Sequence, residues 1–225
     1  ASVEVSACDV SDGDALRALV ESISTDRPLR GVIHTARVLD DGILNSLTEE
    51  RMSKVLRPKV DGAWNLHTTT ETTPLDFFVL FSSAAGIMGA PGQGNYAAAN
   101  SFMDALCEHR RSRGLAGVSV AWGPWAGGGM AAELDSADQV RMQRQGVGAL
   151  EMAQGMALLE RAMTQDAALS VAMSLDVRRL QQVIERSGME VPPLYRGLVR
   201  TSVGGAAPSA LKKRLAALGE DERPP

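Results

Sequence analysis

Two stretches decide the fold, Phe78-Val79-Leu80-Phe81-Ser82-Ser83 and Gly94-Asn95-Tyr96-Ala97-Ala98-Ala99-Asn100. The first is apolar and aromatic, which predicts a buried strand that ends on two serines. A loop rich in glycine and proline separates it from the second, which predicts a helix of small residues. Tyr96 and Asn100 are four residues apart, so they share one face of that helix.

A serine at a strand end that faces a tyrosine and an asparagine suits chemistry on a carbonyl oxygen. Hydroxyl groups can donate hydrogen bonds to that oxygen, and a phenol can also give it a proton. A phenol has a pKa of roughly 10, so it needs a nearby cation to deliver protons near neutral pH. The best candidate for that cation is Lys59, in the run Arg57-Pro58-Lys59.

Apolar runs alternate with amphipathic segments along most of the chain. The predicted strands are 3–10, 29–36, 76–81, 117–122 and 169–175. The predicted helices are 15–23, 48–67 with a kink at Pro58, 95–113, a short one over 136–145, and 150–164. This alternation predicts an α/β fold, a Rossmann-like, doubly wound parallel sheet with helices on both faces.

In such sheets, ligands bind beyond the carboxyl ends of the strands. Four segments of the sequence fall at predicted strand ends. They are Asp9, Ala36-Arg37, Ser82-Ser83 and 122–125. We therefore expect these segments to meet at one edge of the sheet and to form a ligand site there.

The composition of the chain argues against several classes of protein. The 225 residues carry a formal net charge of −4 with no long basic run, so nucleic acid is not an expected partner. No apolar run could cross a membrane, and the expected location is cytoplasmic. Cys8 and Cys107 are too few for a disulfide framework, and no metal site is predicted. Both ends of the chain are typical of a piece of a longer protein.

Five motifs in order resemble one family. They are His34-Thr35-Ala36 with 38–42, Lys59-Val60-Asp61-Gly62-Ala63, 81–86, Tyr96-Ala97-Ala98-Ala99-Asn100, and Trp122-Gly123-Pro124-Trp125. Together they resemble the ketoreductase domain of modular type I polyketide synthases, a branch of the short-chain dehydrogenase/reductase superfamily. The resemblance implies that 1–191 is the C-terminal portion of the catalytic domain. It also implies that 192–225 is a linker, with a short amphipathic helix over 211–218, leading towards an acyl carrier domain.

The resemblance also implies catalytic roles. Most short-chain dehydrogenases have Tyr-x-x-x-Lys, whereas here Asn100 takes the lysine position and Lys59 comes from the preceding helix, an exchange known in the polyketide branch. Tyr96 would protonate the carbonyl oxygen as hydride arrives from NADPH, and Ser83, preferred over Ser82, would orient that oxygen. The implied substrate is a β-ketoacyl thioester on an acyl carrier protein, and neighbouring polyketide synthase domains are implied partners.

Cofactor contacts follow from the same resemblance, with Asp9 near the adenine. The implied set is Asp9, Val10, Ala36, Arg37, Lys59, Tyr96, Pro124 and Trp125. The family's Gly-rich dinucleotide loop and its 2′-phosphate-reading region precede Val3, so we expect this chain to lack the N-terminal Gly-rich β-α unit. Arg37 replaces the usual glycine, and its side chain would either obstruct the cofactor or turn to meet a phosphate.

A stereochemical marker is also present. Leu39-Asp40-Asp41 resembles the signature of B-type ketoreductases, which give the D-(3R)-hydroxy product. Met88 stands where A-type enzymes carry a tryptophan, and Ala98 stands where epimerising B-type domains carry a proline. The predicted substrate and stereocontrol set is Leu39, Asp40, Asp41, Met88 and Gln93.

Other interpretations remain open. A non-catalytic structural module of a megasynthase, with impaired cofactor binding, is the main alternative, favoured by Arg37 and the missing loop. A serine hydrolase is a poor fit because no Gly-x-Ser-x-Gly elbow is present. His34 is expected to be structural.

Overall fold

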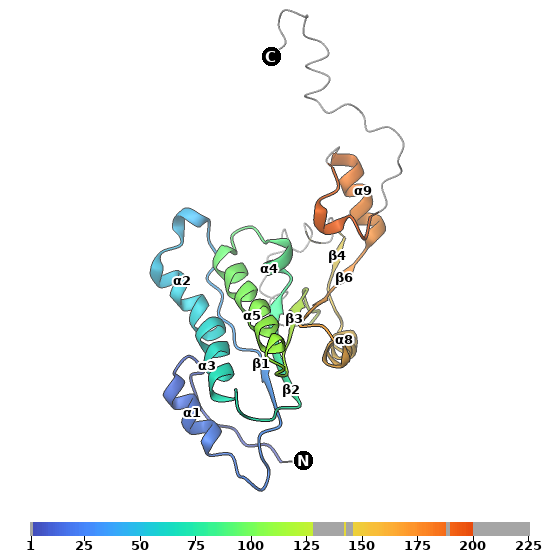
Figure 1. Cartoon of the computed structure of the whole chain (residues 1–225). Helices are drawn as coiled ribbons and strands as arrows, with labels where there is room; N and C mark the ends of the chain where they lie inside the picture. The colour runs from blue at the N-terminus through green and yellow to red at the C-terminus, as the bar shows by residue number, and fades with distance from the viewer. Residues whose placement is uncertain (1, 128–141, 143–145, 188–189, 200–225) are drawn as a thin grey trace, which may run out of the picture. The chain divides into compact units, whose positions relative to one another are not determined.

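The computed structural model describes residues 2–127, 142, 146–187 and 190–199. The chain divides into two compact units, 1–176 and 177–225. The first unit holds the sheet and its helices (Figure 1). The second holds α9 (Val177–Ser187), on which Leu180 and Ile184 are buried, and the short turn η3 (Pro193–Tyr195).

The main sheet of the first unit is parallel. Its four strands are β1 (Gly31–His34), β2 (Phe77–Ser83), β3 (Val118–Trp122) and β5 (Leu169–Ala172), in the spatial order β1-β2-β3-β5. The register pairs Ser83 with Trp122, and Trp122 with Ala172, so the carboxyl ends of β2, β3 and β5 lie level at one edge. The predicted parallel sheet is confirmed.

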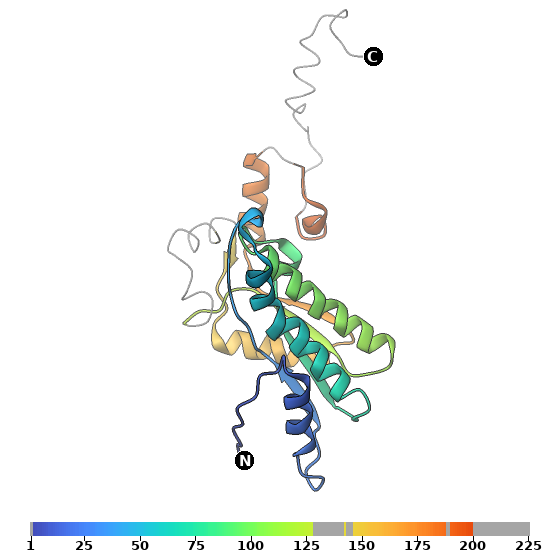
Figure 2. The same cartoon turned by 90° about the vertical axis from the view of Figure 1, so that its left-hand side faces the viewer.

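Helices cover both faces of this sheet, as predicted. Side chains alternate along β2, so Phe78 and Leu80 face one layer and Val79 faces the other. The first layer contains α1 (Gly13–Glu21), α3 (Gly62–Thr69) and α5 (Gly94–Ser112), and the second contains α8 (Met152–Thr164). Figures 1 and 2 show α2 and α3 following one another end to end, with α5 beside them over the first face.

The helix predicted over 48–67 is present but interrupted at Pro58. α2 (Glu49–Leu56) passes into a π-helical turn, η2 (Arg57–Asp61), and then into α3. Proline has no N–H for the helical ladder, and its ring displaces the preceding turn, which accounts for the wider turn here. This irregularity matters because the π turn carries Lys59 and buries it.

The strand predicted over 3–10 is wrong. The segment forms no ladder, and Val3 and Val5 are 88% and 90% exposed. Alternating residues favour an extended backbone, but a strand also needs a partner. Among the described residues β1 pairs only with β2, and 3–8 pairs with neither. Asp9 therefore follows an unpaired segment rather than a strand.

Smaller differences lie around the sheet. The strand predicted over 169–175 is split, because β6 (Ser174–Leu175) leaves the main sheet and pairs antiparallel with β4 (Val147–Gly148). A short helix, α4 (Ala85–Met88), and a 3-10 turn, η1 (Leu44–Ser46), were not predicted. The helices expected over 136–145 and 211–218 lie outside the described residues. No described helix has the length and apolar character needed to cross a membrane.

Candidate active site

A cavity of about 150 Å³ opens beyond the carboxyl ends of β1, β2 and β3. Segments from three of the four predicted strand ends meet here, and Asp9 is not among them. The cavity brings together six of the predicted site residues: Arg37, Lys59, Ser83, Tyr96, Pro124 and Trp125. Thr35, Phe81, Ser82, Trp122 and Gly123 complete the lining.

Tyr96 lies in the first turn of α5 and is almost fully buried. Its side chain interacts with the side chains of Ser83 and Asn100. Burial raises the pKa of the Tyr96 phenol, and the contacts with Ser83 and Asn100 only partly offset that effect. The phenol therefore stays protonated around neutral pH and is available as a proton donor.

Lys59 enters the cavity from the π turn. Its Nζ donates a hydrogen bond of 3.0 Å to the carbonyl oxygen of Phe81 and lies 5.3 Å from the centre of the Tyr96 ring. Burial, followed by the positive charge of Arg37, lowers the pKa of Lys59 to about 8. The cation that the phenol needs is thus adjacent to it, with a pKa close to the operating pH.

Asn100 lies one turn beyond Tyr96 on α5 and is fully buried. Its Nδ2 donates to the backbone carbonyl of Tyr96 at 2.7 Å. Its Oδ1 has no hydrogen-bond partner among the described residues, which is uncommon for a buried acceptor. Asn100 therefore holds the first turn of α5 and offers an acceptor beside the tyrosine.

Asp104 was missed by the sequence analysis. It lies one turn beyond Asn100, is buried, and accepts a hydrogen bond of 2.6 Å from Ser119 Oγ. Burial raises the pKa of the Asp104 carboxyl, while Ser119, Ser82 and the charge of Lys59 act in the opposite direction. The signal was available, because residues 96, 100 and 104 repeat at a spacing of four on one helix face.

Arg37 lies on the cavity wall and is half-buried. Its charge lowers the pKa of Lys59. It also acts to lower the pKa of Tyr96, but this effect is smaller than the rise caused by burial. Two cations therefore border the cavity, which favours an anion or a developing oxyanion inside it. Whether Arg37 obstructs a cofactor or contacts a phosphate stays a prediction.

The chain fits one end of a dinucleotide cofactor. Tyr96 and Lys59 offer polar groups to a nicotinamide riboside, beside Pro124 and Trp125 at the cavity wall. Asn100 is fully buried and is not part of the cavity lining. The other predicted contacts lie outside the lining. Asp9 is exposed and accepts from Ser11 N at 2.9 Å, Val10 O accepts from Asn65 Nδ2 at 3.1 Å, and Ala36 is half-buried.

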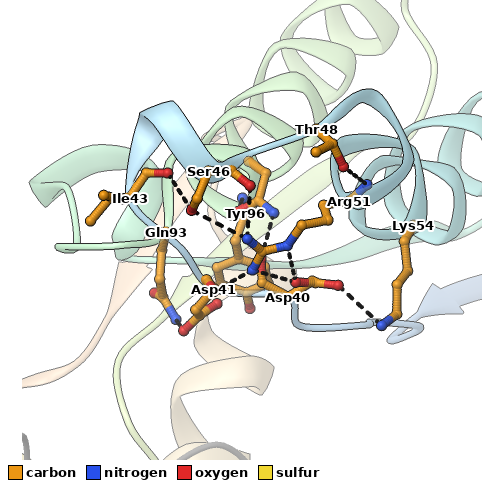
Figure 3. Close-up of polar contacts among 10 residues, drawn as sticks. Asp40, Asp41, Ile43, Ser46, Thr48, Arg51, Lys54, Gln93 and Tyr96 are labelled. Atoms are coloured by element: carbon orange, nitrogen blue, oxygen red, sulfur yellow. Dashed lines mark hydrogen bonds and ion pairs between the residues drawn. The ribbon is translucent and has the colours of Figure 1, made fainter.

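The predicted stereocontrol residues lie beside the cavity rather than in its lining. Asp40 pairs with Arg51 and Lys54, and Asp41 accepts from Gln93 Nε2 at 2.8 Å (Figure 3). Leu39 and Met88 are half-buried, and Met88 ends α4. Arg51 was not predicted. A signal for it was present in the sequence. Arg51 is the third residue of its helix, a position where a capping box has Glu or Gln and where the helix dipole disfavours a positive charge.

Comparison with known proteins agrees with this geometry. A family model described as "KR domain" matches residues 1–127. The spectinabilin polyketide synthase system protein NorB of Streptomyces orinoci is 46% identical over 229 residues, covering 100% of this chain and 10% of that protein. The putative inactive phenolphthiocerol synthesis polyketide synthase type I Pks1 of Mycobacterium tuberculosis is 44% identical, covering 99% of this chain and 14% of that protein.

Solved structures give the same result. A ketoreductase from the first module of phoslactomycin biosynthesis in Streptomyces sp. HK803 superposes with a TM-score of 0.79 at 35% identity, covering 90% of this chain and 46% of that one. A structure of A-type ketoreductases from a modular polyketide synthase gives a TM-score of 0.73 at 36% identity, covering 92% and 41%. This chain spans about a tenth or less of the first curated relatives. It belongs to the ketoreductase domain family of modular polyketide synthases.

Proposed function

We propose that this chain contributes to the NADPH-dependent reduction of a β-ketoacyl thioester, carried on an acyl carrier protein, to a D-(3R)-β-hydroxyacyl thioester. The observation that carries the proposal is the convergence of Tyr96, Lys59 and Ser83 on one cavity at the sheet edge. The neighbouring polyketide synthase domains supply and accept the thioester. The proposed layout is a catalytic portion over 1–191 and a linker over 192–225, in a cytoplasmic assembly.

The reaction adds a hydride to the ketone carbon and a proton to its oxygen. NADPH, when bound, supplies the hydride. Ser83 donates a hydrogen bond to the ketone oxygen and holds it next to Tyr96. Tyr96 gives its phenolic proton to that oxygen as negative charge develops there. Lys59 stabilises the phenolate electrostatically, and Asn100 keeps the first turn of α5 in place through the Tyr96 carbonyl.

Stereochemistry rests on the marker residues. Leu39, Asp40 and Asp41 support a B-type assignment, and Ala98 supports reduction without epimerisation. Structural likeness does not discriminate between types, because the similar structures include one described as A-type and one described as C2-type.

The test is NADPH oxidation with a β-ketoacyl thioester surrogate, followed by chiral analysis of the hydroxy product. The chain is assayed alone and extended upstream through the Gly-rich loop that the family carries. We expect turnover in the extended form with the 3R product in excess. A 3S product would refute the B-type assignment. No turnover in the extended form would refute the reductase assignment for this chain.

A second candidate is a non-catalytic module of the megasynthase. It is favoured by Arg37, whose charge and bulk stand at the cavity wall where the family usually has glycine. Under this alternative, the extended form binds NADPH poorly and Arg37→Gly restores binding. Under the reductase proposal, wild-type binding is already measurable by cofactor fluorescence and Arg37→Gly changes it little.

A further inference from the structure

Arg51 lies outside the reaction cavity and holds the loop of residues 39–42, here called the marker loop because it contains Leu39-Asp40-Asp41. Its guanidinium donates to Asp40 Oδ1 through Nε at 2.6 Å and pairs with the same oxygen through Nη2 at 2.6 Å. Nη2 also donates to the carbonyl oxygen of Asp41 at 2.6 Å. Nη1 donates to the carbonyl oxygen and the hydroxyl of Ser46 at 2.9 and 3.3 Å. Figure 3 shows the guanidinium among these groups.

The Arg51 contacts differ from an ordinary surface ion pair. The side chains of Arg51 and Asp40 are 29% and 18% exposed, and Lys54 Nζ contacts the second Asp40 oxygen at 3.1 Å. The Arg30–Asp76 pair has similar distances, but its side chains are 60% and 55% exposed. Partial burial and several acceptors make the Arg51 contacts the stronger set.

The backbone next to the marker fits the guanidinium closely. A Cβ added to Gly42 would lie 2.8 Å from both Arg51 Nη1 and Ser46 Oγ. Glycine is therefore the residue that lets the arginine reach the loop at this point. The three atoms nearest to that Cβ all belong to side chains, so a methyl group at position 42 would displace the guanidinium and the Ser46 hydroxyl.

The other side of the same loop is tied to the segment before Tyr96. Gly42 N donates to Gly92 O at 2.7 Å, and Gln93 Nε2 donates to Asp41 Oδ2 at 2.8 Å. The fully buried Asn95 donates to Asp40 O at 2.9 Å, while its Oδ1 accepts the Tyr96 backbone N–H at 2.8 Å. One side chain thus joins the marker loop to the tyrosine.

The helix that carries Arg51 continues directly into the π turn that carries Lys59. The marker loop therefore connects two segments. One is α2 with the π turn that carries Lys59, and the other is 92–96, which carries Tyr96. We propose that Arg51 is a positioning residue for stereocontrol and that it fixes the marker loop between these two segments. This inference rests on the proposed reductase function. It assigns Asp40 to holding the loop in place rather than to direct contact with substrate.

The experiment compares Arg51→Gln and Gly42→Ala with wild type. Arg30→Gln is the matched control, because it breaks an exposed arginine–aspartate pair far from the loop. The first readout is hydrogen exchange at Gly42, Ser46 and Leu47, whose amides are bonded within the loop and its neighbours. The second is the 3R to 3S product ratio in the extended form, together with the NADPH dissociation constant.

Both loop variants should raise exchange at these amides by roughly ten- to 100-fold, the effect of losing charge-assisted bonds. The product ratio should fall by roughly tenfold while NADPH affinity is unchanged, because substrate orientation is lost and cofactor contacts are not. Arg30→Gln should change neither readout. Unchanged exchange in Arg51→Gln would overturn the proposal, and so would raised exchange with an unchanged product ratio. Absence of reductase activity in wild type would instead refute the proposed function and, with it, the stereocontrol role. The exchange comparison would then report only whether Arg51 holds the loop.

Discussion

The pKa of Lys59 sets the pH range in which we expect the activity to decline. The pKa of Lys59 is lowered to about 8, whereas burial raises that of Tyr96 above its ordinary value of 10.0. Between pH 7 and 9 the lysine therefore titrates and the tyrosine does not. By simple titration, the ammonium fraction falls from roughly nine-tenths at pH 7 to roughly one-tenth at pH 9. We expect kcat/KM for ketone reduction to fall about tenfold over this range, since that parameter reports the free enzyme.

The assay measures initial rates of NADPH oxidation with the surrogate thioester from pH 6 to 10, on the extended form. Lys59→Met should lower the rate and remove the decline near pH 8, because the titrating group is gone. Arg17→Met, which removes an exposed cation from α1, should keep it. A level profile to pH 9.5, or a decline near pH 8 that survives Lys59→Met, would refute the reasoning.

Three further perturbations follow from the geometry. Asp104→Asn removes the carboxylate whose charge raises the pKa of Lys59, so the decline should move to lower pH, whereas the exposed Asp166→Asn should leave it in place. Phe78→Ala removes a fully buried ring that lies under the Arg110 guanidinium, so it should lower the free energy of unfolding by about 3–5 kcal/mol in urea titrations. An unchanged midpoint would contradict the assigned core. Gly155→Ala would place a Cβ 2.1 Å from Trp125 Cη2, so it should cost about 1–3 kcal/mol in the same titrations and weaken NADPH binding; wild-type values for both would show that Trp125 does not border the site.

Local patterns predicted the parts of the site that depend on periodicity. Tyr96 and Asn100 share a helix face because of their spacing, and Ser83 ends a buried strand because its neighbours are apolar. Both placements are found in the structure. Lys59 was placed by its motif and by the need for a cation. Its burial could not be predicted, because burial depends on a π turn that arises where Pro58 interrupts the helix.

Features that depend on distant partners were not predictable in the same way. The segment 3–10 has the alternation of a strand, but strand formation requires a neighbour that periodicity does not reveal. Two of the partners of Arg51, Asp40 and Asp41, lie eleven and ten residues back, in a loop that Gly42 ties to Gly92 through a backbone hydrogen bond. Asp104 meets Ser119 only because α5 packs across β3.

In the proposed reaction, Tyr96 donates the proton to the ketone oxygen. The most direct measurement is the single-turnover reduction rate of Tyr96→Phe in the extended form, with the NADPH dissociation constant measured on the same sample. We expect a loss of roughly 10²- to 10⁴-fold in rate with cofactor affinity close to that of wild type. A Tyr96→Phe protein that binds NADPH normally and reduces the ketone at the wild-type rate would contradict it.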